Sequence, residues 1–351
     1  MSDRTLVLAP WLTRAIGEVF AAVGLSPRAA QSVASGLVDA DMRGTPSHGT
    51  LLVPMYIERI RQGSVSLKEE ASIVRDAEAI AVLDAHHALG QLTGDQAMAL
   101  AIDKARSYGI GAVTVRRAFH FGGAYRYARS AAAAGCIGIA AANTRPPMPA
   151  PGAAAPVVGS NSIAIGVPVA GGEPLLFDMA LSEAALGKIR PAEQGGRPIP
   201  ATWAIDRDGC PNTGASAAPA DMLLPAAGHK GYGLDLLVDI LTGALASGGF
   251  GSVRGRYAAT SVPNDCAQFF LALDIHTFGD PDAFAGRLAT LTAQVTGSPT
   301  APGGERLLLP GQLEAERHAA ATASGIAMDA RVLAALRESA ASVGVTLSDP
   351  C

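Results

Sequence analysis

The strongest constraint on the fold is a change of hydrophobic period along the chain, from helical to strand-like and back to helical. Apolar residues recur at helical spacing from Leu12 to Val23. Ser26 and Pro27 then supply an N-cap and a first-turn proline for a second helix that runs through Val38. The sequence therefore predicts an α-helical hairpin at its start.

A break and a third helix follow this hairpin. The segment RGTP at 43–46 interrupts the second helix, and Gly63 would close a third one from Leu51 to Gln62. Ser47 is placed to cap that third helix. Ser47 and His48 thus fall at a junction between a loop and a helix.

From about residue 79 the pattern changes to short β-like runs that alternate with helical stretches. Strands are predicted at Ala79–Asp84, Ile110–Val115, Cys136–Ala142, Ser162–Pro168, Leu175–Asp178 and Phe269–Asp274, and helices at Asp95–Tyr108, from Gly231 onward, and at Pro281–Val295, Leu313–Ala321 and Met328–Val343. A Gly- and Pro-rich run from Gln194 to Ala218 reads as a long loop. The predicted class is α/β (α+β), with helical segments at both chain ends that pack together.

Size and composition limit the architecture and the partners. A chain of 351 residues exceeds the size at which one core usually keeps growing, so two packing units are expected. Apolar residues make up 49% and aromatics only 5%, with 40 glycines, which favours close packing of helices on a sheet. The net charge of -4, without blocks of like charge, argues against nucleic-acid and membrane-surface partners.

Cysteine and histidine placement argues against disulfides and metal sites. The cysteines at 136, 210, 266 and 351 are far apart and form no CxxC, which suits free thiols in a reducing cytoplasm. His86 and His87 are adjacent and point to different faces of any regular element, so no metal is expected. The N-terminus lacks the basic flank and long apolar run of a signal peptide, so we expect a cytoplasmic protein.

The segment RGTPSHG at 43–49 is the most informative local motif. Histidine exchanges protons near neutral pH without help, and the hydroxyl of Ser47 beside His48 could orient the ring or relay its proton. The alternative is that Ser47 only caps the next helix and that His48 is an exposed loop residue. Spacing alone leaves both interpretations open.

Two glycine-rich segments are candidate anion sites. His120 precedes Phe121, Gly122 and Gly123 at a helix start, where backbone N–H groups favour phosphate. The segment GHKGYG at 228–233 combines permissive glycines with the charge of Lys230. The alternatives are a buried histidine between aromatic rings and an ordinary helix entry.

Common catalytic signatures are missing. No GxGxxG follows a predicted strand, and neither GxxxxGK[ST] nor GxSxG occurs, which disfavours a Rossmann site, a P-loop and a nucleophile elbow. The residues alone therefore indicate an enzyme-like α/β protein with a Ser-His loop.

Ordered segments along nearly the whole chain resemble the type-2 malate/L-lactate dehydrogenases. That family includes ureidoglycolate, sulfolactate and diketogulonate dehydrogenases and the Δ1-piperideine-2-carboxylate/Δ1-pyrroline-2-carboxylate reductases. The segments are ADMRGTPSHG (40–49), LGQLTGDQAM (89–98), HFGGAYRYA (120–128), ANTRPPMPAPG (142–152), GSNSIAIGVP (159–168), FDMALSEAALGKI (177–189), GGRPIPATWAIDRDG (195–209), GHKGYGLDLLVDILTGALASGGFG (228–251) and LLPG (308–311).

The resemblance implies a non-Rossmann nicotinamide-binding fold that uses NADPH or NADH and forms a homodimer or an assembly of dimers. It divides the chain into a helical substrate and oligomerisation domain, 1–75 with 312–351, and a nicotinamide-binding α/β domain, 76–311. His48 would donate the proton, with Ser47 and Lys188 as further catalytic residues. Cofactor contacts would come from His120, Phe121, Gly122, Gly123, Ala124, Tyr125, Asp178, Met179, Ala180, His229, Lys230, Glu305, Arg306, Pro310 and Gly311. Substrate contacts would come from Ser160, Leu186 and Gly187.

The chain departs from the family where the substrate carboxylate is bound. Many members carry an arginine four residues after the histidine, in the pattern SHGxxR, where this chain has Leu52. Arg145 could replace that arginine from another loop. Lys188 stands where the imino-acid reductases have an acidic residue, which favours oxo acids.

The resulting prediction is an NAD(P)H-dependent oxidoreductase that reduces a small 2-oxo acid or a cyclic 2-imino acid. Alternatives are a fold that has lost turnover and serves as a binding or assembly protein, and a lyase or hydratase that uses His48 without a cofactor. Arg126 and Arg306, near the expected cofactor loops, lean toward NADPH, although both could be surface arginines.

Overall fold

The computed structural model describes residues 4–153, 155–184, 189, 192, 196–206, 208–214, 222–251, 253–255 and 259–350. Helices and short helical turns lie at α1 (Ala9–Ala22), α2 (Pro27–Met42), η1 (Pro46–His48), η2 (Thr50–Leu52), α3 (Val53–Arg61), α4 (Gly90–Tyr108), α5 (Tyr125–Ala133), α7 (His229–Asp239), η3 (Ile240–Ala244), α8 (Ile275–Phe278), α9 (Pro281–Thr296), α10 (Gln312–Ser324) and α11 (Ala330–Ser342). Strands lie at β1 (Arg4–Val7), β2 (Ser72–Ala77), β3 (Ile80–Asp84), β4 (Ile110–Ala118), β5 (Cys136–Ala142), β6 (Met148–Pro149), β7 (Pro156–Val158), β8 (Ser162–Val167), β9 (Leu175–Ala180), β10 (Ala204–Ile205), β11 (Met222–Leu223), β12 (Cys266–Asp274) and β13 (Ile326–Asp329).

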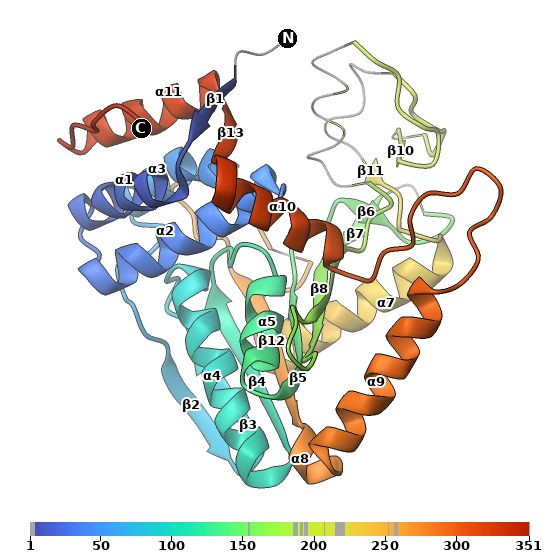
Figure 1. The fold of residues 1–351 in the computed structure, drawn as a ribbon. Helices are drawn as coiled ribbons and strands as arrows, with labels where there is room; N and C mark the ends of the chain where they lie inside the picture. The colour runs from blue at the N-terminus through green and yellow to red at the C-terminus, as the bar shows by residue number, and fades with distance from the viewer. Residues whose placement is uncertain are drawn as a thin grey trace.

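A seven-stranded mixed sheet forms the centre of the molecule, in the order β2-β3-β4-β12-β5-β8-β9. Within this sheet, β3 and β4 pair parallel and the other described neighbours pair antiparallel. Helices α4 and α5 pack against β4, β12, β5 and β8, whereas α7 and η3 contact β5, β12 and β4 (Figure 1). The predicted α/β class is confirmed.

Small residues bring these helices close to the sheet, as the composition predicts. A side chain at Gly111 would place its Cβ 2.0 Å from the Ala101 carbonyl oxygen on α4, and one at Gly166 would lie 2.3 Å from that of Ala128 on α5. These contacts leave no room for a methyl group, because interiors are packed at crystal-like density.

Segments from both chain ends share a second hydrophobic core. It joins apolar residues of α1, α2 and α3 with Ile326 and Met328 of β13 and Leu336 of α11. β1 pairs antiparallel with β13, so the two ends of the chain meet at one end of the molecule (Figure 1). This confirms that the chain ends pack together, while the domain limits at 75 and 312 stay a prediction.

Local sequence signals predict a helix correctly where the capping residue and the hydrophobic period agree. Ser26 caps α2, because its Oγ accepts a hydrogen bond of 3.2 Å from the Ala29 N–H. The expected helix from Leu51 is shorter: two 3-10 turns precede α3, and Ser47 lies inside η1 rather than capping α3. Met328 and Asp329, expected to begin the last helix, belong to the strand β13 instead, since pairing with β1 overrides local preference.

Candidate active site

The Ser47–His48 pair lies in the turn η1, directly after α2. Ser47 Oγ and His48 Nδ1 are 3.0 Å apart and form a hydrogen bond, so the serine orients the ring as proposed from the sequence. Both residues are partly exposed. His48 is therefore held by a neighbour and accessible to a ligand.

Asp41 anchors this turn from the end of α2. Its Oδ2 accepts hydrogen bonds from the Thr50 N–H at 2.8 Å and from the Thr50 hydroxyl at 2.6 Å. Burial raises the pKa of Asp41 to about 6, partly offset by these hydrogen bonds. Gly49 lies so close that a Cβ there would stand 2.0 Å from Asp41 Oδ1. A glycine at 49 is thus required for the turn that carries His48.

A second histidine faces His48 across the site. The rings of His48 and His120 are stacked, with centroids 5.4 Å apart and an interplanar angle of 24°. His120 follows β4, whereas His48 precedes α3, so the fold brings together two segments that are distant in sequence. The two histidines singled out from separate motifs therefore form one site.

Tyr56 and Gln91 fix the second histidine. The Gln91 side-chain nitrogen donates to the Tyr56 hydroxyl at 3.0 Å, and that hydroxyl lies 2.6 Å from His120 Nδ1. Since Tyr56 accepts from Gln91, its own proton can be donated to His120 Nδ1, which leaves the proton of the neutral ring on Nε2. Sequence analysis missed both residues, because a Tyr and a Gln within helices look like ordinary packing residues.

Three of the expected cofactor segments are adjacent in space. The Tyr125 N–H at the start of α5 donates to Asp178 Oδ2 on β9 at 3.2 Å. The Leu176 N–H of the same strand donates to the Pro310 carbonyl at 3.0 Å. A Cβ on Gly311 would stand 2.8 Å from Leu176 Cβ. Residues 120–125, 178–180 and 310–311 therefore border one region.

Asp178 has solvent-exposed atoms, while its carboxylate is surrounded by protein atoms. Desolvation raises its pKa to about 6, with a further contribution from Glu314 on α10. The helix start at Tyr125 thus receives a carboxylate from its own chain, which modifies the proposal that this N-terminus holds a phosphate.

The expected cofactor residues on α7 stand at its exposed first turn. The Ala226 N–H just before this helix donates to the Leu181 carbonyl at 3.0 Å, one residue beyond β9. His229 and Lys230 are exposed, and a Cβ on Gly228 or Gly233 would meet no atom within 4 Å. Open space around these glycines next to a lysine suits a dinucleotide phosphate.

The expected substrate residues lie on neighbouring loops. Ser160 Oγ is 2.7 Å from Ser182 Oγ, and the Thr144 N–H beside Arg145 donates to Asn161 Oδ1 at 2.8 Å. Leu186, Gly187 and Lys188 lie outside the described residues. The structure thus joins the Arg145 and Ser160 loops.

Leu52 is completely buried in the helical core, so it contributes packing rather than a ligand contact. The two arginines that lean toward NADPH are both engaged. Arg126 binds Asp95 and the Ser32 hydroxyl, and Arg306 forms an exposed ion pair of 2.6 Å with Glu316. Arg306 thus carries a surface ion pair, the alternative that the sequence left open.

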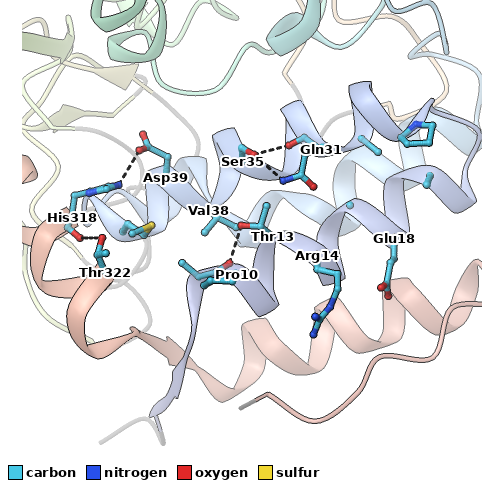
Figure 2. A pocket seen from close by; sticks show the side chains of 16 residues that line it. Pro10, Thr13, Arg14, Glu18, Gln31, Ser35, Val38, Asp39, His318 and Thr322 are labelled. Carbon is cyan, nitrogen blue, oxygen red and sulfur yellow. Dashed lines mark hydrogen bonds and ion pairs between the residues drawn. The ribbon is translucent and has the colours of Figure 1, made fainter.

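A separate pocket of about 790 Å³ lies between α1, α2 and α10 (Figure 2). None of the expected site residues lines it. Several of its polar groups contact other residues of the lining. The Thr13 hydroxyl donates to the Ala9 carbonyl at 2.8 Å, and His318 Nε2 lies 3.4 Å from Asp39 Oδ1. The stacked pair His48 and His120 lies outside this pocket.

The described residues contain no group of three or more His, Cys, Asp or Glu side chains able to hold a metal ion. Among them, no helix is long and apolar enough to cross a membrane.

This fold and site define a mixed α/β protein with a solvent-accessible histidine pair, and comparison with known proteins assigns it to a class of oxidoreductases. A sequence model described as Malate/L-lactate dehydrogenase matches residues 8–337. The chain belongs to this family of dehydrogenases and is an enzyme of the oxidoreductase class.

Relatives named for different activities match at similar levels. Malate dehydrogenase of Pyrococcus abyssi is 36% identical over 335 residues, covering 93% of this chain and 92% of the relative. Ureidoglycolate dehydrogenase (NAD(+)) of Escherichia coli K12 is 34% identical over 304 residues, covering 86% of each chain. The structure of delta1-piperideine-2-carboxylate reductase from Pseudomonas syringae aligns with a TM-score of 0.86 at 30% identity, covering 95% of this chain and 99% of that one.

Proposed function

We propose that this enzyme uses NADH or NADPH to reduce a small 2-oxo acid or cyclic 2-imino acid, with His48 as the proton donor. The observation that carries the proposal is the pair of stacked histidines, 5.4 Å apart, one of them held by Ser47. The expected cofactor segments border Asp178 and the open glycines of α7, so the residues present fit a dinucleotide.

The nicotinamide, when bound, supplies a hydride to the carbon of a C=O or C=N bond. Negative charge then develops on the heteroatom, and a proton donor there lowers the barrier. Ser47 engages His48 Nδ1, so we assign proton delivery to His48 Nε2. Ser47 keeps Nδ1 engaged and so directs Nε2 toward the substrate, Nε2 takes up its next proton from water, and Lys188 remains a proposed further catalytic residue.

We propose two substrate classes, because the relatives point to both. The malate and ureidoglycolate dehydrogenases support an oxo acid, and the structural match to a piperideine-carboxylate reductase supports a cyclic imine.

Two assays test this function. Binding of NADH or NADPH should raise the melting temperature, because a ligand that binds only the folded state stabilises it. Nicotinamide absorbance is then followed with pyruvate, oxaloacetate, pyrroline-2-carboxylate and piperideine-2-carboxylate. We expect turnover with at least one of them and its loss in His48→Asn but not in the control His276→Asn, an exposed histidine on α8. No shift with either cofactor would refute the proposal.

We further propose that Arg145 binds the substrate carboxylate in place of the family arginine that Leu52 replaces. A charge-assisted hydrogen bond contributes about 1.5–3 kcal/mol, so Arg145→Ala should raise KM by roughly tenfold to a hundredfold. Arg75→Ala, at an exposed position of β2, is the matched control. An unchanged KM in Arg145→Ala would contradict this role.

The outward face of α7 and η3 supports a homodimer. Leu237 and Leu245 are 55% and 59% exposed, whereas Asp235 and Asp239 are buried and the exposed Lys230 lies at the first turn of α7. The apolar surface beyond that first turn suits an isologous contact with a second copy of the chain. The described cysteines form no disulfide, which supports a reducing cytoplasm as the location.

A further inference from the structure

Helix α7 carries its carboxylates on the buried face. Asp235 is 0% exposed and Asp239, one turn later, is 7% exposed. Residues four apart on a helix are neighbours on its surface, so the two side chains can meet. Two acidic groups thus share one buried space, where ionising both is costly.

Each carboxylate has one oxygen bonded and one oxygen without a partner. Asp235 Oδ1 accepts from the Asn161 N–H at 3.1 Å, and Asp239 Oδ2 accepts from the Gly159 N–H at 3.5 Å. Asp235 Oδ2 and Asp239 Oδ1 are both buried without a hydrogen-bond partner. Burial raises the pKa of Asp239 and the Asn161 and Asn143 side chains lower it in part, and one proton held by the pair would remove the cost of burying two negative charges together.

No cation compensates this pair within the described residues. Neither carboxylate forms an ion pair there, and Asp239 is the charged group that acts on Asp235. The strands packed against α7 are β7, which has no titratable side chain, and β5, which contributes only Cys136 at its far end. A proton is therefore the available counter-charge.

The pair holds a residue that connects the substrate loops. Asn161 is 0% exposed, and its side-chain nitrogen donates to the Asp235 carbonyl at 3.2 Å. Its Oδ1 accepts from the Thr144 N–H, next to Arg145, and its own backbone follows Ser160. One buried asparagine thus links α7, the Arg145 loop and the Ser160 loop.

We propose that Asp235 and Asp239 share a single proton and, in that singly protonated form, act as positioning residues that hold Asn161 and so set the Arg145 and Ser160 loops for the substrate. The positioning role rests on the proposed function, whereas the shared proton does not. Burial, and then the charge of Asp239, favours protonation and raises the pKa of Asp235 to about 8.

The expected consequence is weaker substrate binding at alkaline pH. Losing the shared proton leaves two negative charges one turn apart, which push the side chains away from Asn161 and Gly159. If binding requires the protonated pair, KM should rise by about tenfold between about pH 7 and about pH 9. Asp235→Asn keeps an acceptor for Asn161 and places an amide donor toward Asp239, so its KM should change little over that range.

Two readouts separate the parts of the proposal. Carbon NMR of labelled aspartate should show one protonated carboxyl at neutral pH, and this resonance should be lost in Asp235→Asn. KM is then measured against pH for the wild type, Asp235→Asn and the control Thr242→Ser, whose hydroxyl bonds to the Val238 carbonyl on the same helix.

The KM of the control Thr242→Ser should change with pH in the same way as that of the wild type. Two ionised carboxylates at neutral pH would overturn the shared proton. Equal KM profiles in the wild type and Asp235→Asn would overturn the positioning role. Failure of every substrate would instead refute the proposed function and leave the NMR result standing.

Discussion

Replacing Asp235 with asparagine should stabilise this protein, and the gain should grow with pH. Burial raises the pKa of Asp235 from 3.8 to about 8, so the folded protein binds this proton more tightly than the unfolded chain does. The folded state is therefore penalised as pH rises above the ordinary pKa of the group, and the penalty levels off once pH passes about 8.

The magnitude follows from the same values. Each tenfold change in protonation corresponds to about 1.4 kcal/mol, so the penalty is about 2 kcal/mol near pH 5 and about 4 kcal/mol near pH 7. It reaches about 6 kcal/mol above pH 8, and all three figures are upper bounds because structural relaxation lowers them. Asparagine does not ionise, so the unfolding free energy of the variant should not fall with pH for this reason.

Urea unfolding at a fixed protein concentration, repeated across the pH range, measures the difference in unfolding free energy. The Asp235→Asn and wild-type curves should diverge between about pH 5 and about pH 8 and run parallel above it. Asp103→Asn, at an exposed position of α4, is the control and should run parallel to wild type throughout. Parallel curves for Asp235→Asn would show that the carboxyl titrates normally, and the reasoning would fail.

Three further variants test the site and the assembly. Gly49→Ala should lower kcat and cost about 1–3 kcal/mol of stability in urea unfolding, because its Cβ would stand 2.0 Å from Asp41 Oδ1. Tyr56→Phe should lower the unfolding free energy by about 1–3 kcal/mol, because the buried Gln91 amide loses its acceptor. It should also shift the pH-rate profile, because His120 Nδ1 loses its hydrogen bond to the Tyr56 hydroxyl. An unchanged profile would show that Tyr56 does not act on His120 in turnover. Leu237→Glu should weaken self-association by at least about tenfold in sedimentation equilibrium, and a wild-type monomer would refute the dimer proposal.

The secondary structure that the sequence predicts well is the part encoded by local signals. The cap at Ser26 and the helical period of α1 and α2 act within a few residues, and β3 and β5 match the predicted strands closely. The sheet order was not predictable in this way. β12 lies between β4 and β5 although it follows β5 by more than a hundred residues, and only long-range pairing decides that place.

The exposed edge strand β2 was missed for a related reason. Most of its residues face solvent, so it lacks the alternation of apolar and polar residues that marks a half-buried strand. Its pairing with β3, rather than its own pattern, makes it a strand.

The sequence singled out residues carried by glycine-rich motifs and missed those that support them. Ser47, His48 and His120 stand in such motifs, and the structure brings them together. Asp41, Tyr56 and Gln91 act through hydrogen bonds to residues outside their own helices, and nothing in their local sequence indicates those partners. A buried polar side chain becomes informative only when its partner is known.

Arg43, at the end of α2, and Arg59, on α3, cannot supply the cation that a substrate carboxylate would need. Arg43 is committed to Asp39 at 3.1 Å and lies over the Tyr125 ring, and Arg59 donates to the Val262 carbonyl at 2.9 Å from a fully buried position. Moving either one to a ligand would break contacts that hold the helical core, and Leu52 offers no charge. We therefore keep Arg145, on the loop whose Thr144 N–H binds Asn161, as the proposed cation for a substrate carboxylate beside His48.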